Sequence, residues 1–121
     1  MKPWLMTALL GLTWLLGIAR GQEYKPTFDL KAPAIVAEGQ RLFNRSCAGA
    51  CHGRDGQEGF NGPTLFSKVY LDPLYVFVIF ITGRSGSAMP PWTGRLPDDE
   101  LWKIIAFVSS LGDQAKAAAA K

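Results

Sequence analysis

Both cysteines of the chain and its one histidine lie within six consecutive residues, CAGACH at positions 47–52. No other cysteine or histidine exists to complete a site elsewhere. A structural zinc ion needs four ligands and an iron–sulfur cluster generally needs four thiolates, so neither fits this set. A disulfide between Cys47 and Cys51 stays open as an alternative, but it gives the adjacent His52 no role.

Two thiols followed directly by an imidazole are what covalent haem attachment requires. The thiols form thioethers with the two haem vinyl groups, and the neighbouring imidazole is held beneath the iron as an axial ligand. The pattern therefore predicts one haem c per chain, bound covalently through Cys47 and Cys51, with His52 on the iron.

The first 21 residues have the pattern of an export signal. Lys2 precedes an uncharged, Leu-rich stretch over residues 4–18, and the small residues Ala19 and Gly21 have the spacing of a cleavage site. The stretch is short for a membrane span, which needs about 20 apolar residues. Arg20 lies within the cleavage site, so an uncleaved membrane anchor is the alternative. In both cases we expect the rest of the chain in the periplasm, where haem is attached.

The charge of the chain does not indicate nucleic acid. The formal net charge is +3, but Lys2 and Arg20 belong to the leader, and without them 11 basic residues face 10 acidic ones. The remaining basic residues form no run of the kind that contacts phosphates. We therefore expect no nucleic-acid partner, and contact with a membrane only if the leader is uncleaved.

Residues that favour helix starts and ends divide the rest of the chain into a lead-in, a helical domain and a tail. A lead-in over 22–33 is expected to be extended, and the tail over 112–121 to be flexible, which leaves a domain over 34–111. Asp72 and Pro73 form a helix start, although the β-branched residues over 74–82 also allow a buried strand. The predicted helices cover residues 33–44, residues 73–82 and the segment from Pro97 or Asp98 to Gly112.

The chain resembles the class I c-type cytochromes from about Ala34 to Leu111. The resemblance rests on GQRLFNRSCAGACHGRDG around the cysteines, GPTL at 62–65, AMPPW at 88–92 and LPDDELWKIIAFVSSL at 96–111. It implies an all-α cytochrome c fold, with three to five short helices around one covalently bound haem.

The resemblance also implies roles for single residues. His52 is the expected proximal iron ligand and Met89 the distal one, and the Pro63 carbonyl is expected to accept a hydrogen bond from the other His52 nitrogen. Gly39 and Phe43 of the first helix are expected to cross the last helix at Phe107.

One departure from the family is evident. The usual attachment motif has two residues between the cysteines, and this chain has three, at positions 48–50. Because the vinyl groups are a fixed distance apart, the extra residue must bulge outward. The three residues are small, and Gly49 can adopt backbone angles that others avoid. The departure leaves open whether Cys47 forms its thioether.

Further residues are expected around the haem. Met89 precedes two prolines in an irregular segment, where a rigid loop can direct its sulfur, although a lone methionine also commonly fills cores. Trp92 and Arg84 are expected to contact the haem propionates, with a packed aromatic and a solvated cation as their alternatives. The expected apolar lining of the pocket is Leu65, Phe66, Leu74, Phe77 and Ile81.

These expectations converge on an electron carrier, not an enzyme. An iron with His and Met ligands has no open coordination site, which suits electron transfer between redox proteins such as a dehydrogenase, a reductase or an oxidase. Two alternatives remain. The chain could be a haem subunit of a larger dehydrogenase complex, or a haem protein that binds a small ligand if Met89 does not ligate.

Overall fold

The computed structural model describes residues 24–67 and 69–121, and the predicted leader lies outside them. Within the described residues there is no β-sheet, only an isolated bridge between Thr93 and Leu96. The all-α prediction is therefore confirmed. The helical elements are α1 (Pro33–Ser46), η1 (Ala48–His52), η2 (Arg54–Gly56), α2 (Pro73–Thr82) and α3 (Asp98–Ala119).

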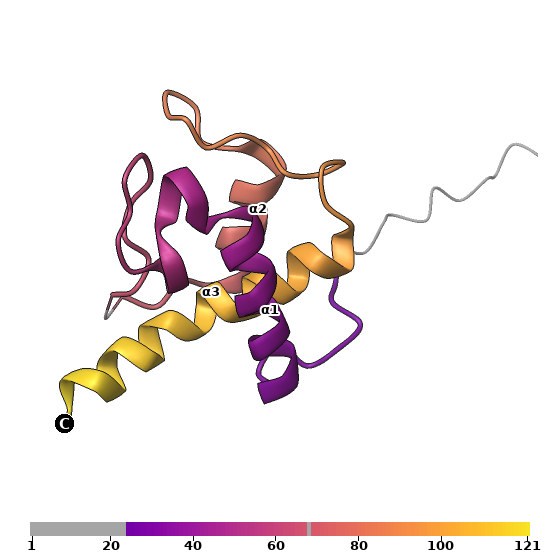
Figure 1. Ribbon diagram of the computed structural model, residues 1–121. Coiled ribbons are helices and arrows are strands. Elements are labelled where there is room, and N and C mark those ends of the chain that lie inside the picture. The colour runs from indigo at the N-terminus through magenta and orange to yellow at the C-terminus, as the bar shows by residue number, and fades with distance from the viewer. Residues whose placement is uncertain (1–23, 68) are drawn as a thin grey trace, which may run out of the picture.

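The crossing of α1 over α3 is the largest helix contact in the fold (Figure 1). A Cβ added at Gly39 would lie 1.9 Å from the backbone oxygen of Lys103, so only glycine permits this approach. Beside it, the rings of Phe43 and Phe107 pack with centroids 5.2 Å apart. The predicted contact between a glycine and aromatic residues at this crossing is therefore present.

Helix α2 begins and ends where the sequence predicts. The Asp72 side chain accepts hydrogen bonds from the backbone N–H groups of Leu74 and Tyr75, and Pro73 occupies the first helical position. Gly83 ends the helix with a φ of 66°. The capping residues therefore favour a helix over the strand that β-branched residues also allow.

Among the described residues, no helix is both long and apolar enough to cross a membrane.

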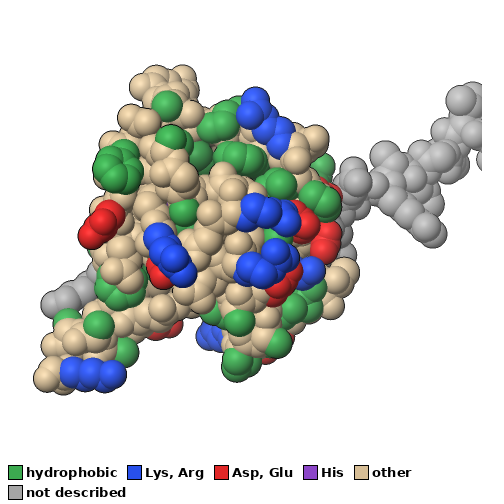
Figure 2. Space-filling view, in the orientation of Figure 1, with side chains coloured by type: hydrophobic (Ala, Val, Ile, Leu, Met, Phe, Trp, Pro, Cys, Tyr) green, Lys and Arg blue, Asp and Glu red, His purple; other side chains and the backbone are tan. Residues whose placement is uncertain are grey.

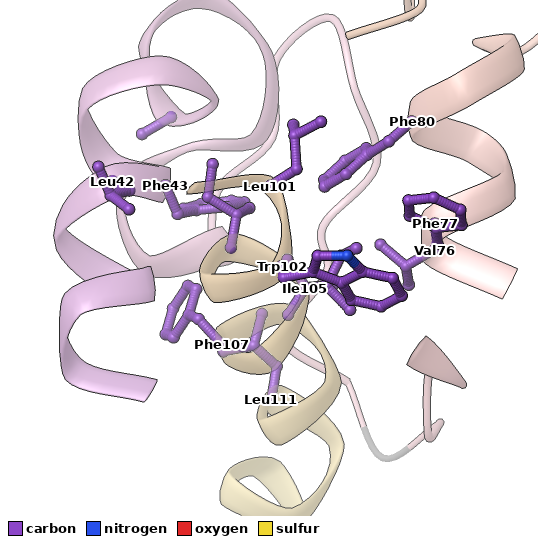
Figure 3. Close-up of a cluster of buried hydrophobic side chains, with 13 residues drawn as sticks. Leu42, Phe43, Val76, Phe77, Phe80, Leu101, Trp102, Ile105, Phe107 and Leu111 are labelled. Atoms are coloured by element: carbon purple, nitrogen blue, oxygen red, sulfur yellow. The ribbon is translucent and has the colours of Figure 1, made fainter. Parts of the chain in front are cut away.

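The core lies along α3, which is covered by α1 on one side and α2 on another (Figure 3). The ring of Phe77 stacks on Trp102 with centroids 4.5 Å apart and planes within 8°. Ile104 and Ile105 are fully buried beneath these contacts. Helix α3 is thus the central element, which explains why its middle turns carry apolar residues on nearly every side.

The predicted end of the last helix and the predicted extended conformation of the lead-in are both wrong. Helix α3 does not end at Gly112 but continues to Ala119, so the segment 112–121 is largely helical. Gly112 has a packing role instead, because a Cβ there would lie 2.9 Å from the backbone oxygen of Val69. The lead-in is not simply extended either, since a turn closed by the bond from Ala32 N–H to Asp29 O brings Leu30 against the core.

Candidate functional site

A cavity of about 630 Å³ brings together the residues predicted to attach the haem, to ligate its iron and to contact its propionates. Its volume lies within the range of about 300–1,000 Å³ typical of ligand sites. Its walls come from the cysteine segment, the loop after it, α2 and the loop between α2 and α3. The predicted residues among its lining are Cys47, Cys51, His52, Pro63, Arg84, Met89 and Trp92.

The His52 imidazole is held in one orientation. It is only 9% exposed, and its Nδ1 lies 2.9 Å from the carbonyl oxygen of Pro63. Because a carbonyl can only accept, Nδ1 carries the proton in this bond and Nε2 is left as the nitrogen that can bind a metal. The predicted hydrogen bond between His52 and Pro63 is thus present.

Gly62 brings the Pro63 carbonyl close to the imidazole. A Cβ added at Gly62 would lie 2.9 Å from Cε1 and 3.0 Å from Nδ1 of His52. No residue with a side chain fits this position unless the ring or the loop shifts. The sequence analysis did not identify this role: Gly62 belongs to the GPTL segment, but residues 53–62 contain four glycines, and their spacing does not show which one lies against His52.

The two cysteines are free thiols that line the same cavity. Burial, together with the nearby Cys51, raises the pKa of the Cys47 thiol to about 12, so this sulfur stays protonated at neutral pH. Within the described residues, no group of three or more His, Cys, Asp or Glu side chains could hold a metal ion.

Met89 reaches the cavity from the loop between α2 and α3. The Met89 carbonyl accepts a hydrogen bond from the Arg84 backbone N–H at 3.1 Å, and the Phe80 carbonyl accepts one from the Trp92 N–H at 2.6 Å. These two bonds fix the loop to the end of α2 on both sides of Met89. Its side chain is partly buried against the core, so the thioether is held at the cavity wall.

Trp92 and Arg84 present unpaired donors at this cavity. The indole Nε1 of Trp92 is buried without a hydrogen-bond partner, a costly arrangement unless a bound group accepts from it. Arg84 is exposed and takes part in none of the ion pairs among the described residues. These donors suit a ligand with carboxylates, such as the propionates of haem. The residues present therefore fit a haem.

The residues of α2 that were predicted to line the cavity lie on other faces of the helix. Leu74 is 65% and Ile81 37% exposed, and Phe77 packs in the core on Trp102. Phe66 packs on the core outside the cavity lining, whereas Leu65 lines it as predicted. Because every residue of α2 before Thr82 is apolar or aromatic, the sequence offers no polar face from which to derive the phase. The residues of α2 that do line the cavity are Tyr75, Val76, Ile79 and Phe80.

Comparison with known proteins agrees with this arrangement. Residues 34–108 match the family model described as cytochrome C oxidase, cbb3-type, subunit III. The chain is 35% identical to cytochrome c6 of Leptolyngbya boryana over 80 residues, which are 62% of this chain and 91% of that protein.

Two further relatives extend the comparison. The cbb3-type cytochrome c oxidase subunit FixP of Rhizobium meliloti (strain 1021) is 34% identical over 85 residues, 66% of this chain but only 29% of FixP. The chain thus spans less than a third of that relative. The crystal structure of cytochrome CL from Methylophaga aminisulfidivorans MPT superposes with a TM-score of 0.56 at 29% identity, covering 69% of this chain and 64% of that one.

The family match covers the cavity together with α1, α2 and the crossing of α1 over α3. It thus includes the cysteine segment, His52 and the loop that carries Met89. The chain belongs to the cytochrome c family, in the group described by the model of the cbb3-type oxidase subunit III.

Proposed function

We propose that this protein is an exported electron carrier with one haem c, attached through Cys47 and Cys51 and ligated by His52 and Met89. The observation that carries the proposal is that two thiols, a fixed imidazole and a thioether line the same cavity. Bound haem iron supplies a one-electron change between its ferrous and ferric states.

The protein's part is to hold the two axial ligands in place. Pro63 fixes the tautomer and the plane of His52, which leaves Nε2 for the iron and raises its basicity. The hydrogen bonds around Met89 hold the loop that carries the sulfur. With His52 and Met89 as its ligands, a bound haem iron would have no open coordination site for a substrate. We therefore propose a carrier and not an enzyme, and rank binding of a small ligand below it.

Donors at the cavity wall favour carboxylates on the cofactor. The unpaired Nε1 of Trp92 is proposed to donate to one propionate, and the Arg84 guanidinium to lie beside the other. A hydrogen bond removes the cost of the buried N–H, and the cation offsets the negative charge. Both contacts orient the cofactor relative to His52.

We propose that the protein works in the periplasm with redox enzymes as partners. The leader over residues 1–21 supports export. On the face shown in Figure 2, basic and acidic side chains are intermingled and form no continuous basic patch. The partners are proposed to be a dehydrogenase, a reductase or an oxidase, met in brief encounters.

A second candidate role is that of a haem subunit held in a larger complex. The outer side of α2 presents apolar side chains to solvent, with Leu74 65% and Val78 51% exposed. Surfaces of this kind commonly mark protein interfaces. The FixP relative is described as an oxidase subunit, which favours the same role. Electron transfer is the chemistry in both cases.

The visible absorption spectrum of the natively matured protein, oxidised and then reduced, tests the proposal. A low-spin spectrum with the weak far-red band of sulfur bound to ferric iron is the expected result, and Met89→Ala should abolish that band. A high-spin oxidised spectrum that changes on addition of carbon monoxide would instead favour ligand binding. A protein without haem would contradict both readings.

A further inference from the structure

The extra residue between the cysteines is taken up by a π-helical turn. In η1, the backbone N–H of His52 donates to the Cys47 carbonyl at 3.1 Å and that of Gly53 to the Ala48 carbonyl at 2.9 Å. Both bonds join residues five apart, where an α-helix would join residues four apart. A single π-turn accommodates one more residue than the α-helical turn it replaces.

The middle of the turn faces solvent, and the two cysteines at its ends face the cavity. Gly49 and Ala50 are exposed, whereas Ala48 is buried in the core. A Cβ added at Gly49 would meet nothing within 4 Å, and its φ is not positive. The turn therefore makes no use of the backbone freedom of Gly49, and the bulge forms without it. Cys47 and Cys51, at the ends of the bulge, both line the cavity.

The turn also anchors the loop that orients His52. The Cys51 carbonyl accepts hydrogen bonds from the N–H groups of Phe60 at 2.9 Å and Gly62 at 3.0 Å. The next residue, Pro63, supplies the oxygen that fixes the imidazole. The turn that takes up the extra residue is thus tied to the segment that holds the axial ligand.

We propose that the π-turn allows both Cys47 and Cys51 to form thioethers with one haem despite the three-residue spacer. The inference rests on the proposed function. In each attachment the thiol adds across a vinyl C=C bond: a C–S bond forms, the S–H bond and the vinyl π bond break, and the hydrogen moves to the other vinyl carbon. No electrons are gained or lost overall, so the step needs no oxidant.

Counting free thiols in the natively matured protein tests this inference. The protein is denatured, treated with iodoacetamide and weighed intact by mass spectrometry. The expected mass is that of the mature chain plus one haem, with no alkylated cysteine. The visible absorption band of the haem in alkaline pyridine should lie at the wavelength of a haem whose two vinyl groups are both saturated. A Cys47→Ser variant supplies the one-thioether standard for that band.

The other results separate the inference from the function on which it rests. One haem together with an alkylated Cys47 would leave the proposed role in electron transfer intact, but it would overturn attachment through Cys47 and with it the two-thioether inference. A protein with no covalent haem would overturn the proposed function as well.

Spacer variants test the role of the π-turn itself. Gly49→Ala should keep both thioethers, because its added methyl group meets open space. One further alanine inserted after Gly49 exceeds what a single π-turn absorbs, and we expect alkylation of Cys47 to rise at least tenfold over Gly49→Ala. Two intact thioethers in the insertion variant would show that the turn does not control attachment.

Discussion

Two consecutive residues of the following loop, Gly62 and Pro63, hold His52 in place, and they act in different ways. Pro63 contributes a hydrogen-bond acceptor, and Gly62 contributes the absence of a side chain. The first role is implied by family resemblance. The second is visible only in the structure, because a glycine that avoids a clash has the same sequence signature as a glycine in any loop.

Gly62→Ala should displace the imidazole. The new methyl carbon would lie 2.9 Å from Cε1 of His52, so the ring or the loop must move and the hydrogen bond to Pro63 must weaken. We expect a loss of about 1–3 kcal/mol in the free energy of unfolding, as for other overpacked sites. Urea unfolding of the haem-loaded protein measures it, with Gly49→Ala as the control. Equal stability of the two variants would contradict the tight contact.

At the scale of elements, α2 shows what patterns can and cannot predict. Its ends follow from Asp72, Pro73 and Gly83, which have specific capping chemistry. Which of its faces points inward cannot be predicted, since α2 carries apolar residues on every face. The π-turn of η1 is a similar case: the length of the spacer predicts an outward bulge, but not the hydrogen bonds between residues five apart that form it.

Asp72→Ala should destabilise α2 at its start. The carboxylate accepts from two backbone N–H groups, at 2.9 Å from Leu74 and 3.2 Å from Tyr75, which then lose their partner. Loss of such a cap costs about 1 kcal/mol. Urea unfolding should show this decrease, whereas Asp72→Asn should retain most of the stability. If the two variants are equally destabilised, the side-chain cap is not the cause.

A polar contact ties α1 to η2 and should respond to pH. The Asp55 carboxylate accepts from Asn44 Nδ2 at 2.7 Å and from Gln40 Nε2 at 3.0 Å, and these bonds lower the pKa of Asp55 from its ordinary 3.8. Because the pKa of Asp55 is lower in the folded state than in the unfolded state, the contact contributes its full stabilisation to the folded state at pH values above the unfolded-state pKa. Its contribution is lost as the pH falls through the folded-state value.

Asn44→Ala should therefore cost more at neutral pH than in acid. We expect a loss of about 1–3 kcal/mol at pH 7, because Asn44 also accepts from the Asp55 backbone N–H at 2.8 Å. The difference from wild type should shrink, without vanishing, as Asp55 becomes protonated. Gln40→Ala, which removes one bond only, should show a smaller effect. A difference that does not change with pH would contradict the role of the Asp55 charge.

At the scale of the whole molecule, the sequence predicts the chemical groups of the site better than its walls. Cys47, Cys51 and His52 lie within six consecutive residues, so they are close together without any long-range folding. Met89 and Trp92 could be placed beside them only through family resemblance, since no local pattern connects residues so far apart. The apolar walls depend on helix phase, which packing against α3 determines.

The continuation of α3 beyond Gly112 can be tested by truncation. A chain that ends at Ala115 should keep its stability within about 0.5 kcal/mol, because the residues after it are exposed. A chain that ends at Leu111 should lose about 1 kcal/mol or more, since Ala115 is buried and Gly112 packs on Val69. Denaturant unfolding compares the two. Equal stability would mean that the end of the helix contributes nothing.

The crossing of α1 over α3 joins the two ends of the domain, and an ion pair between Arg45 and Glu100 spans the same gap at 2.9 Å. If the chain is exported amino end first, as proposed, Cys47 and Cys51 emerge long before α3 is present to complete the core. Contacts so distant in sequence form late, because a long loop must close first. The order of synthesis would thus give the proposed haem attachment an interval in which both cysteines are present and the last helix has not yet completed the core.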